Sequence, residues 1–517
     1  MSFYDDASLV FLPSGGAGKD TKAYSIKPTN GDGDFTFSRG SNLTATRIDS
    51  NGLIEKGREN LFLNSNTPAT QSITITNGGV YVLSFLGSGS VVASGGASFT
   101  LNGTGEFDRV ENYFVSSSTS VTLTISGTIT EPQLELGLAA TEYIESGATK
   151  GKAGILEDSP RFDYSGGASC PSLLVEQSRS NIVGFTEYLE GTNWGVGGST
   201  GLELRTSITS PDGNNGVYLV TSEAGNISSR VQYNLGTLGN DHIFSVFIKG
   251  TGSATRIRLR NNAGSQNRVE YDIDSSGNFT LNNETALDDY YGVDDYGNGW
   301  HRVYLKVETS SGSSNFMQIF SDVVDADGSI YVWGAQAEDA SYISSYIPNH
   351  SGGSVTRDAD ITSVTSVSDL IGQTEGTIYC EFEYNGAADT GVFNRIIGLG
   401  TGVTQNRILL AKNNTTAELL AFAVTGGTTQ VSQAISGTSI IGHHKVAISY
   451  KANEYKVYLD GELEFTDTSA SVPATTDVYI GTAEDGTTDN ELGGVVKQSI
   501  IFKEVLSEDD CKALTTI

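Results

Sequence analysis

Residues 445–461 read KVAISY-KANE-YKVYLDG, and this stretch decides the fold of the chain. In both halves apolar residues alternate with polar or small ones, which is the period of a β-strand with one buried face. The polar segment 451–454 and the dipeptide Asp460-Gly461 are typical of turns. The stretch therefore predicts an antiparallel hairpin whose buried face carries six apolar side chains: Val446, Ile448, Tyr450, Tyr455, Val457 and Leu459.

The same alternation recurs throughout the chain, at 72–76, 80–83, 120–125, 256–260 and 304–307. Glycine, asparagine, aspartate and serine interrupt it about every 8–12 residues. This spacing favours β-sandwiches over βαβ units. The best helix signal is 506–514, where Ser507 would be the N-cap and acids fill the first turn. We therefore predict an all-β protein made of tandem antiparallel β-sandwiches.

Composition argues against several classes of protein. The 517 residues include 31 Lys and Arg against 61 Asp and Glu, a formal net charge of −30. This surplus of acids disfavours partners such as nucleic acid or an anionic membrane, because both require clustered basic residues. No stretch approaches 18 apolar residues, so no membrane span is predicted. Cys170, Cys380 and Cys511 are too far apart to indicate a disulfide framework or a zinc site.

The N-terminal residues 1–6 lack the basic region of a Sec-type signal peptide. We therefore expect the protein to be synthesised in the cytoplasm of its host cell and to remain in a reducing compartment until it is assembled or released.

Two pairs of matching motifs bracket two segments of the chain. The opening motif Arg-x-Asn-(Leu/Ile) and the closing motif Gln-x-Glu, followed by Tyr-Ile, each occur twice, at 58–61, 133–144, 179–182 and 336–347. Because both ends match in the same order, duplication is favoured over chance similarity. The predicted organisation is an N-terminal extended attachment region 1–60, a short β-sandwich 61–146, an extended connector 147–182, a longer sandwich 183–350 and a C-terminal sandwich 351–517.

Three stretches, 37–54, 160–181 and 334–360, resemble the motifs of a family of bacteriophage virion proteins described as tail-fibre, head-fibre or structural proteins. The resemblance covers nearly the whole chain. It implies that 183–350 is a jelly roll similar to carbohydrate-binding modules, and that 351–517 is a concanavalin A-like, laminin-G-type lectin sandwich. It also implies display on the virion surface as a fibre or capsid decoration, with other capsid or tail proteins as partners, and assembly as a homotrimer.

Sugar recognition requires aromatic rings beside acids and amides, because the C–H faces of pyranoses stack on rings. The segment 288–296 offers that mixture in an expected loop, and a tryptophan follows the turn at 191–193. Inter-chain packing or a plain exposed loop is the alternative for the tyrosines, and Trp300 and Trp333 are expected in the core. The candidate glycan-binding residues are Trp194, Tyr290, Tyr291, Asp294, Asp295 and Tyr296.

A calcium site is the one cofactor that the sequence raises. The segment 484–491 is rich in oxygen ligands, which Ca²⁺ prefers, and Asp485 and Asp489 are its candidate ligands. It lacks the spacing of an EF-hand loop, so an ordinary acidic turn is the alternative.

The sequence contains no convincing catalytic motif. Glu381 and Glu383 have a spacing that places two carboxylates on one face of a strand, as retaining glycosidases require, but the Glu-x-Asp-x-x-Glu run of laminarinase-like enzymes is absent. His443 and His444 would point to opposite sides of a strand, which is poor for joint metal binding.

We therefore favour a non-enzymatic phage structural protein that contributes to attachment to host-surface glycans. The alternatives are a polysaccharide depolymerase tailspike and a purely architectural capsid decoration protein. A secreted bacterial adhesin is disfavoured, because residues 1–6 do not resemble a signal peptide.

Overall fold

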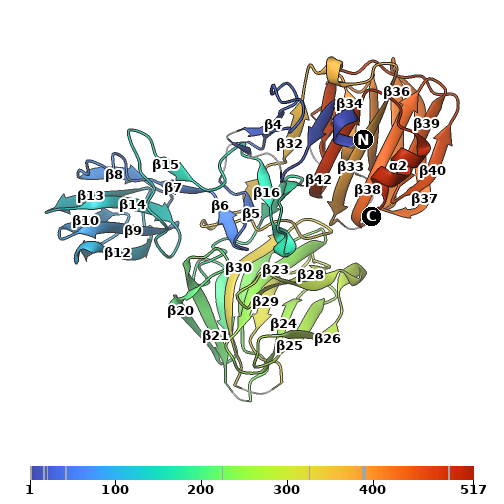
Figure 1. Ribbon diagram of the computed structural model, residues 1–517. Helices are drawn as coiled ribbons and strands as arrows, with labels where there is room; N and C mark the ends of the chain where they lie inside the picture. The colour runs from blue at the N-terminus through green and yellow to red at the C-terminus, as the bar shows by residue number, and fades with distance from the viewer. Residues whose placement is uncertain are drawn as a thin grey trace.

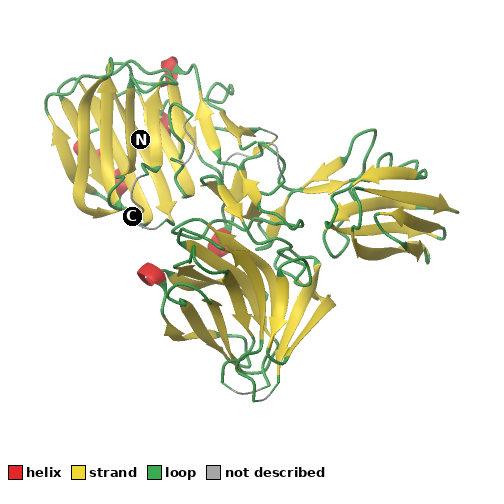
Figure 2. Ribbon diagram, turned by 180° about the vertical axis from the view of Figure 1, so that it is seen from behind, coloured by secondary structure: helices red, strands yellow, loops and turns green. Residues whose placement is uncertain are grey.

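The computed structural model of the protein describes residues 3–14, 18–19, 21–40, 43–223, 225–324, 327–386, 392–486 and 490–517. Its strands form three antiparallel β-sandwiches that extend in different directions from a central region of short strands (Figure 1, Figure 2). The prediction of an all-β protein made of tandem sandwiches is thus confirmed. The helical segments of the described chain are short: α1 (Phe3–Asp6), α2 (Glu508–Thr515), η1 (Ser165–Gly167), η2 (Leu287–Asp289) and η3 (Ser368–Leu370). In that part of the chain no helix is long and apolar enough to span a membrane.

The C-terminal sandwich packs two large sheets against each other. The first sheet contains, in spatial order, β16 (Arg161–Asp163), β17 (Ser172–Val175), β42 (Gly494–Phe502), β33 (Glu375–Tyr384), β38 (Gly442–Lys451), β39 (Glu454–Leu459) and β40 (Glu462–Asp467), and β1 (Leu9–Phe11) also pairs with β42. The second contains β2 (Gly18–Lys19), β3 (Lys22–Ala23), β4 (Phe35–Ser38), β32 (Ile361–Val364), β41 (Asp477–Ile480), β34 (Arg395–Gly400), β35 (Arg407–Lys412), β36 (Glu418–Thr425) and β37 (Thr428–Ser439).

The hairpin predicted at 445–461 is formed by β38 and β39. Val446 lies opposite Leu459 and Tyr450 lies opposite Tyr455, and all six predicted apolar side chains are buried between the sheets. Helix α2 follows with the predicted cap, because the Ser507 hydroxyl accepts a hydrogen bond from the Asp510 backbone N–H at 3.1 Å.

Strands from the N-terminal region and the connector belong to this same sandwich. β1 and β17 both pair with β42, and β4 pairs with β32. The segments predicted as an extended attachment region and an extended connector therefore supply strands and core to the C-terminal sheets. The side chains that they bury there include Phe11, Phe35, Phe37, Leu173 and Val175.

The first module is a small sandwich with its own core. One sheet contains β11 (Phe99–Asn102), β10 (Ser90–Gly95), β13 (Ser120–Ser126) and β8 (Gln71–Thr74). The other contains β12 (Gly105–Val115), β9 (Val80–Gly87) and β14 (Thr130–Leu136).

The central module is larger, with six strands in each sheet. The outer sheet contains β19 (Trp194–Gly197), β22 (Arg230–Gly236), β29 (Asn315–Phe320), β24 (Thr255–Asn261), β25 (Arg268–Ile273) and β26 (Phe279–Glu284). The inner sheet contains β20 (Thr200–Thr209), β21 (Asn215–Ser222), β30 (Ser329–Glu338), β23 (His242–Gly250), β28 (Trp300–Val307) and β27 (Tyr291–Asp295).

The inner sheet of the central module packs on the centre of the molecule. Phe247 and Trp333 lie on the face of this sheet that points away from the module core. They are buried there together with Ile54 and Tyr346 from the central strands and loops. Trp300 belongs to the same cluster, so the expectation that Trp300 and Trp333 are core residues is confirmed.

Three short strand pairs form the centre, which we call the hub (residues 39–40, 43–60, 151–163, 176–181 and 342–360). The pairs are β5 (Thr46–Ile48) with β6 (Ile54–Lys56), β7 (Arg58–Asn60) with β15 (Gly151–Ala153), and β18 (Arg179–Asn181) with β31 (Val355–Arg357). Figure 1 shows all three sandwiches meeting at this region.

The closing motifs of the two brackets are built alike. The Gln133 side-chain oxygen accepts from the Ile144 N–H at 2.7 Å, and the Gln336 oxygen accepts from the Ile347 N–H at 2.7 Å. Each glutamine also donates to the glutamate two residues later, at 2.7 Å in both modules. This shared geometry supports the duplication inferred from the sequence.

Candidate functional site

Buried ion pairs at the hub join stretches that are far apart in sequence. The Arg161 guanidinium bonds to Glu176 at 2.6 Å and also to Asp360. Arg39 bonds to Asp360 at 3.3 Å, and Arg357 bonds to Glu176 at 3.1 Å. These five side chains are at most 8% exposed. Breaking one buried ion pair costs several kcal/mol, because it leaves an unpaired charge inside the protein. The network therefore fixes the connected segments to one another.

Neighbouring groups complete the coordination of these carboxylates. Glu176 accepts from the Ser345 backbone N–H at 2.8 Å and from its hydroxyl at 2.7 Å. Burial opposes the ionisation of Glu176, but the Arg357 and Arg161 guanidiniums outweigh it and hold its pKa well below the usual range. Glu176 is therefore an anion inside the protein.

The hub uses residues from all three stretches that resemble virion-protein motifs: Arg39, Arg161, Glu176, Arg357 and Asp360. A glycine is required beside them, because Gly40 has a φ of +89° and an added Cβ would lie 2.5 Å from the Asp358 carboxylate. The sequence motifs thus contribute a structural junction, and the charges that pair there could not be matched from sequence spacing alone.

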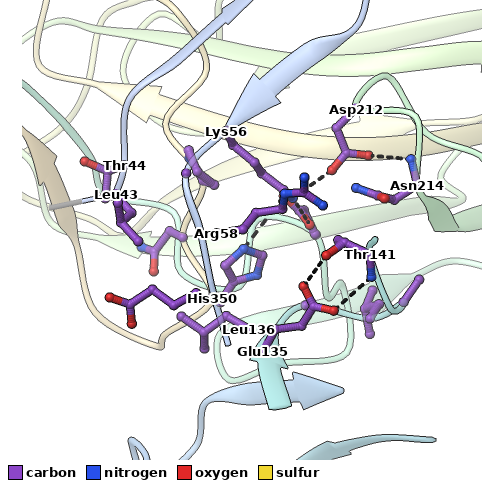
Figure 3. A pocket seen from close by; sticks show the side chains of 18 of the residues that line it. Leu43, Thr44, Lys56, Arg58, Glu135, Leu136, Thr141, Asp212, Asn214 and His350 are labelled. Carbon is purple, nitrogen blue, oxygen red and sulfur yellow. Dashed lines mark hydrogen bonds and ion pairs between the residues drawn. The ribbon is translucent and has the colours of Figure 1, made fainter. Parts of the chain in front are cut away.

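A cavity of about 370 Å³ lies beside the hub, where the first and central modules meet (Figure 3). Its walls come from β6 and β7, from the end of β14 with the loop after it, and from the segments 210–216 and 348–351. This volume falls in the range of small-molecule binding sites, about 300–1,000 Å³. We take the cavity as the candidate functional site of the described chain.

Lys56 is the central charge of the cavity wall. Its ammonium lies 2.9 Å from Glu187 and 2.7 Å from Asp212, and 5.6 Å from the centre of the Trp333 ring. Burial would lower the pKa of Lys56, but the Asp212 and Glu187 carboxylates outweigh burial and raise it above its ordinary value. Burial would raise the pKa of Asp212, but the Lys56 ammonium outweighs burial and lowers it. All three polar groups are therefore positioned for charge pairing.

Other polar side chains extend the site on both walls. The Tyr346 hydroxyl donates to Glu187 at 3.1 Å, and the His350 ring nitrogen lies 4.0 Å from the same carboxylate. Burial lowers the pKa of His350, which favours the neutral form of the ring. On the facing wall Glu135 accepts from the Thr141 N–H at 2.8 Å and from its hydroxyl at 2.6 Å (Figure 3).

This arrangement can hold a small polar ligand between modules, but its carboxylates are already engaged. One ammonium pairs with both Glu187 and Asp212. Sequence reasoning did not single out these residues, because Lys56, Glu187 and Asp212 come from three distant segments with no diagnostic spacing.

The predicted glycan-binding residues do not form a single cluster. Trp194 lies on the edge strand β19 of the outer sheet, where its indole N–H donates to the Gly184 carbonyl at 3.1 Å and its ring contacts Tyr233. The other five residues lie at β27, on the edge of the inner sheet, or next to it.

The residues around β27 differ in exposure. Asp294 and Asp295 are exposed, whereas the Tyr296 ring packs edge-on against Phe247 with a centroid distance of 4.9 Å. The Tyr290 hydroxyl accepts a hydrogen bond from the backbone N–H of residue 343 at 3.2 Å. Tyr291 packs against the module core.

The acidic segment 484–491 is partly neutralised by arginines. Glu484 is buried and pairs with Arg395 at 3.1 Å and also with Arg407. Asp485 is exposed, and Asp489 lies outside the described residues. No group of three or more His, Cys, Asp or Glu side chains suited to a metal ion occurs in the described part of the chain. The guanidiniums beside Glu484 disfavour a cation at this position.

The other residues considered from sequence also have partners. Glu381 lies 2.9 Å from His443, Glu383 lies 3.1 Å from Lys497, and His444 lies 2.7 Å from Asp460. The two neighbouring glutamates therefore pair with different cations instead of facing one shared cleft.

Comparison with known proteins defines the class of the C-terminal sandwich. Residues 358–512 match the family described as the concanavalin A-like lectin/glucanases superfamily. The C-terminal sandwich is therefore a concanavalin A-like domain, as the resemblance implied. No curated protein sequence matches the chain.

Two solved structures are similar to part of the chain. The CBM40 of the Ruminococcus gnavus IT-sialidase bound to alpha2,3 sialyllactose is 18% identical, with a TM-score of 0.25, over 30% of this chain and 91% of that chain. Domain 4 of AbnA, a GH43 extracellular arabinanase from Geobacillus stearothermophilus in complex with arabinotriose, is 13% identical, with a TM-score of 0.26, over 31% of this chain and 73% of that chain.

Proposed function

We propose that the protein is a non-enzymatic glycan-binding protein displayed on the surface of a bacteriophage particle, as a fibre or capsid decoration. The observation that carries the proposal is the concanavalin A-like lectin/glucanase domain at 358–512, whose sheets incorporate the N-terminal strands β1 and β4. A lectin-type sandwich that is built into its own attachment region suits a protein that presents a binding surface.

The hub supports display in a fixed orientation. Its buried ion pairs connect Arg39 near the N-terminus and Arg161 of the connector with Asp360 at the start of the C-terminal domain. A rigid junction reduces the orientational entropy that is lost when several modules bind one surface. The proposed partners are other capsid or tail proteins and a host cell-surface glycan, and the proposed assembly is a homotrimer.

A trimer would strengthen weak sugar contacts, because linked sites raise the effective concentration of the second and third binding events. Size-exclusion chromatography with light scattering measures the mass directly. A stable monomer of 54.6 kDa at all concentrations would exclude the trimer.

A glycan array probed with the full chain tests the binding function. We expect binding to a restricted set of glycans, without release of reducing ends during long incubation with capsular polysaccharide. Release of reducing ends would instead support the depolymerase alternative, and an array without any bound glycan would support a purely architectural protein.

Electron microscopy of intact particles labelled with antibodies against the chain tests the location. Label on the capsid or on the tail would support the proposal and distinguish decoration from fibre. Particles that lack the label while the protein is abundant in the lysate would contradict it.

A further inference from the structure

The outer sheet of the central module carries a concentration of arginines on the face that points away from the module core. In β22, β24 and β25 the inward residues are fully buried, while the outward ones are half-buried or charged. The hub covers the inner sheet instead. We call this outward surface the arginine face; it consists of Arg230, Gln232, Arg256, Arg258, Arg260, Arg268, Glu270, Asp272, Gln318 and Phe320.

Three guanidiniums of the arginine face surround one aromatic ring. Arg230, Arg258 and Arg260 lie 5.8, 5.3 and 5.0 Å from the centre of the Phe320 ring. Phe320 is only 2% exposed although it belongs to the outward face, because these side chains cover it. Stacking on a ring holds each guanidinium plane in place.

Part of this positive charge is balanced within the face. Arg256 pairs with Asp272 at 2.6 Å, and Glu270 is shared by Arg258 at 2.7 Å and Arg268 at 3.4 Å. These carboxylates lie on β25, on one side of the face.

Arg230 and Arg260 are not balanced in this way. Neither forms an ion pair with a carboxylate in the described part of the chain. Arg260 lies directly opposite Arg268 in the β24–β25 register, an arrangement of like charges that destabilises a sheet. Burial and the neighbouring guanidiniums of Arg258, Arg230 and Arg268 lower the pKa of Arg260. An anion would relieve this repulsion.

A network of amides orients the unbalanced guanidiniums. Arg260 donates through Nε to the Gln318 side chain at 2.7 Å, and Gln318 donates to Gln232 at 2.7 Å. Arg230 donates through Nε to the same Gln232 oxygen at 2.8 Å. The Nε contacts leave the Nη ends of Arg260 available for a bidentate contact with a carboxylate.

We propose that the arginine face binds carboxylate-bearing polysaccharides, with a uronate or similar sugar carboxylate held by Arg260 and Arg230 above Phe320. The inference rests on the proposed glycan-binding function and names the class of glycan and the surface that it contacts. The Gln232 amide group beside these arginines can donate to a sugar hydroxyl, which would distinguish a carboxylated sugar from a simple anion.

The charge distribution favours a polysaccharide over nucleic acid. The whole chain has a net charge of −30, and beyond the screening length of about 8 Å its other charges act weakly on a single bound carboxylate. A nucleic-acid duplex carries about one charge per 1.7 Å and extends beyond the arginine face, so binding it would require further basic residues on a chain whose net charge is −30.

Binding of polygalacturonate to the full chain, measured by biolayer interferometry, tests the inference. Fully methyl-esterified polygalacturonate keeps the sugar backbone without the charge and serves as the matched ligand. We expect binding to polygalacturonate, a loss of at least about tenfold on esterification, and weaker binding as salt rises. Equal binding of both polymers would overturn the inference.

Two variants test the residues. Arg260→Gln should weaken polygalacturonate binding about tenfold or more, because a bidentate guanidinium contact is lost. Arg205→Gln is the control, since Arg205 lies on the inner sheet, is 39% exposed and pairs with Glu203 at 2.8 Å; it should leave binding within about twofold. Thermal unfolding without ligand shows whether both variants are folded.

The remaining outcomes separate this inference from the proposed function. Binding of neutral glycans that is unaffected by Arg260→Gln, without binding of polygalacturonate, would overturn the inference and leave the glycan-binding function intact. Tighter binding of duplex DNA than of polygalacturonate, or a dimer that Arg260→Gln converts to a monomer, would assign the face to another partner. Failure to bind any glycan would overturn both.

Discussion

Asn60 and Asn181 occupy equivalent positions in the first and central modules and make the same four hydrogen bonds. The Asn60 amide donates to the Pro132 and Ile144 carbonyls at 3.1 and 2.8 Å, and the Asn181 amide donates to the carbonyls of 335 and 347 at 3.2 and 3.0 Å. Each asparagine oxygen accepts two backbone N–H groups, one of them two residues later in the chain. In each module one asparagine side chain thus joins the opening motif to the closing motif.

Replacing these asparagines should destabilise the module that each one closes. Both are fully buried, so alanine leaves two carbonyls and two N–H groups without partners at about 1–3 kcal/mol each, less what water or relaxation recovers. We expect Asn60→Ala and Asn181→Ala each to lose at least about 2 kcal/mol in urea unfolding, with hydrogen exchange rising in 61–146 and 183–350 respectively. The control is Asn112→Ala, whose half-buried side chain donates a single hydrogen bond, to the Tyr113 carbonyl at 3.0 Å; an equal loss there would contradict this explanation.

The buried carboxylate Glu176 of the hub should make the free energy of unfolding depend on pH in the acid range. The pKa of Glu176 is depressed below its ordinary 4.5 in the folded protein, so the folded state holds fewer protons than the unfolded state as pH falls. Its stabilisation is therefore complete above that value and is lost progressively below it. Urea unfolding between about pH 3 and 7 measures this slope.

The slope should become shallower in Glu176→Gln, which cannot titrate at this position and is less stable at neutral pH because Arg161 and Arg357 lose their partner. Glu454→Gln, on the surface beside Lys451, is the matched control and should keep the native slope. If both variants show the native slope, the hub does not govern the acid sensitivity.

The local alternation of apolar and polar residues predicted the fold class well, whereas the pairing of strands far apart in the sequence could not be predicted. The alternation at 445–461 determines β38, β39 and their shared face because neighbouring strands are joined by a short turn. β1 and β17 have three and four residues and pair with β42, hundreds of residues away in the sequence, so their register leaves no periodic signal. Likewise Arg161 and Asp360 are visible as motif residues, but only the folded chain shows that they pair.

Lys56 should hold the hub to the central module, because both of its carboxylate partners belong to that module. Lys56→Met leaves Glu187 and Asp212 without their ammonium in a largely buried site, at a cost of about 3–5 kcal/mol. We expect a lower urea midpoint, and partial recovery when Asp212→Asn is added, because the second change removes one of the two unpaired charges. Lys150→Met is the control, since Lys150 is 51% exposed and pairs with Glu59 at the surface; a comparable loss in it would contradict the assignment.

The strand order of the C-terminal sandwich predicts that residues 351–517 do not fold alone as they do in the full chain. Without β1, β4 and β17, the edges of β42 and β32 lose their partners, and core side chains supplied by Phe11, Phe35 and Leu173 are missing. Burying one large apolar side chain contributes about 1.5–3 kcal/mol, so their combined loss is comparable with the whole stability of a domain, about 5–15 kcal/mol. We expect the fragment to be insoluble or to unfold without a cooperative transition, and co-expression with residues 1–182 to restore a soluble complex. A fragment that melts cooperatively at the temperature of this domain in the full chain would show that the N-terminal strands are dispensable, and would place the domain boundary at 351 after all.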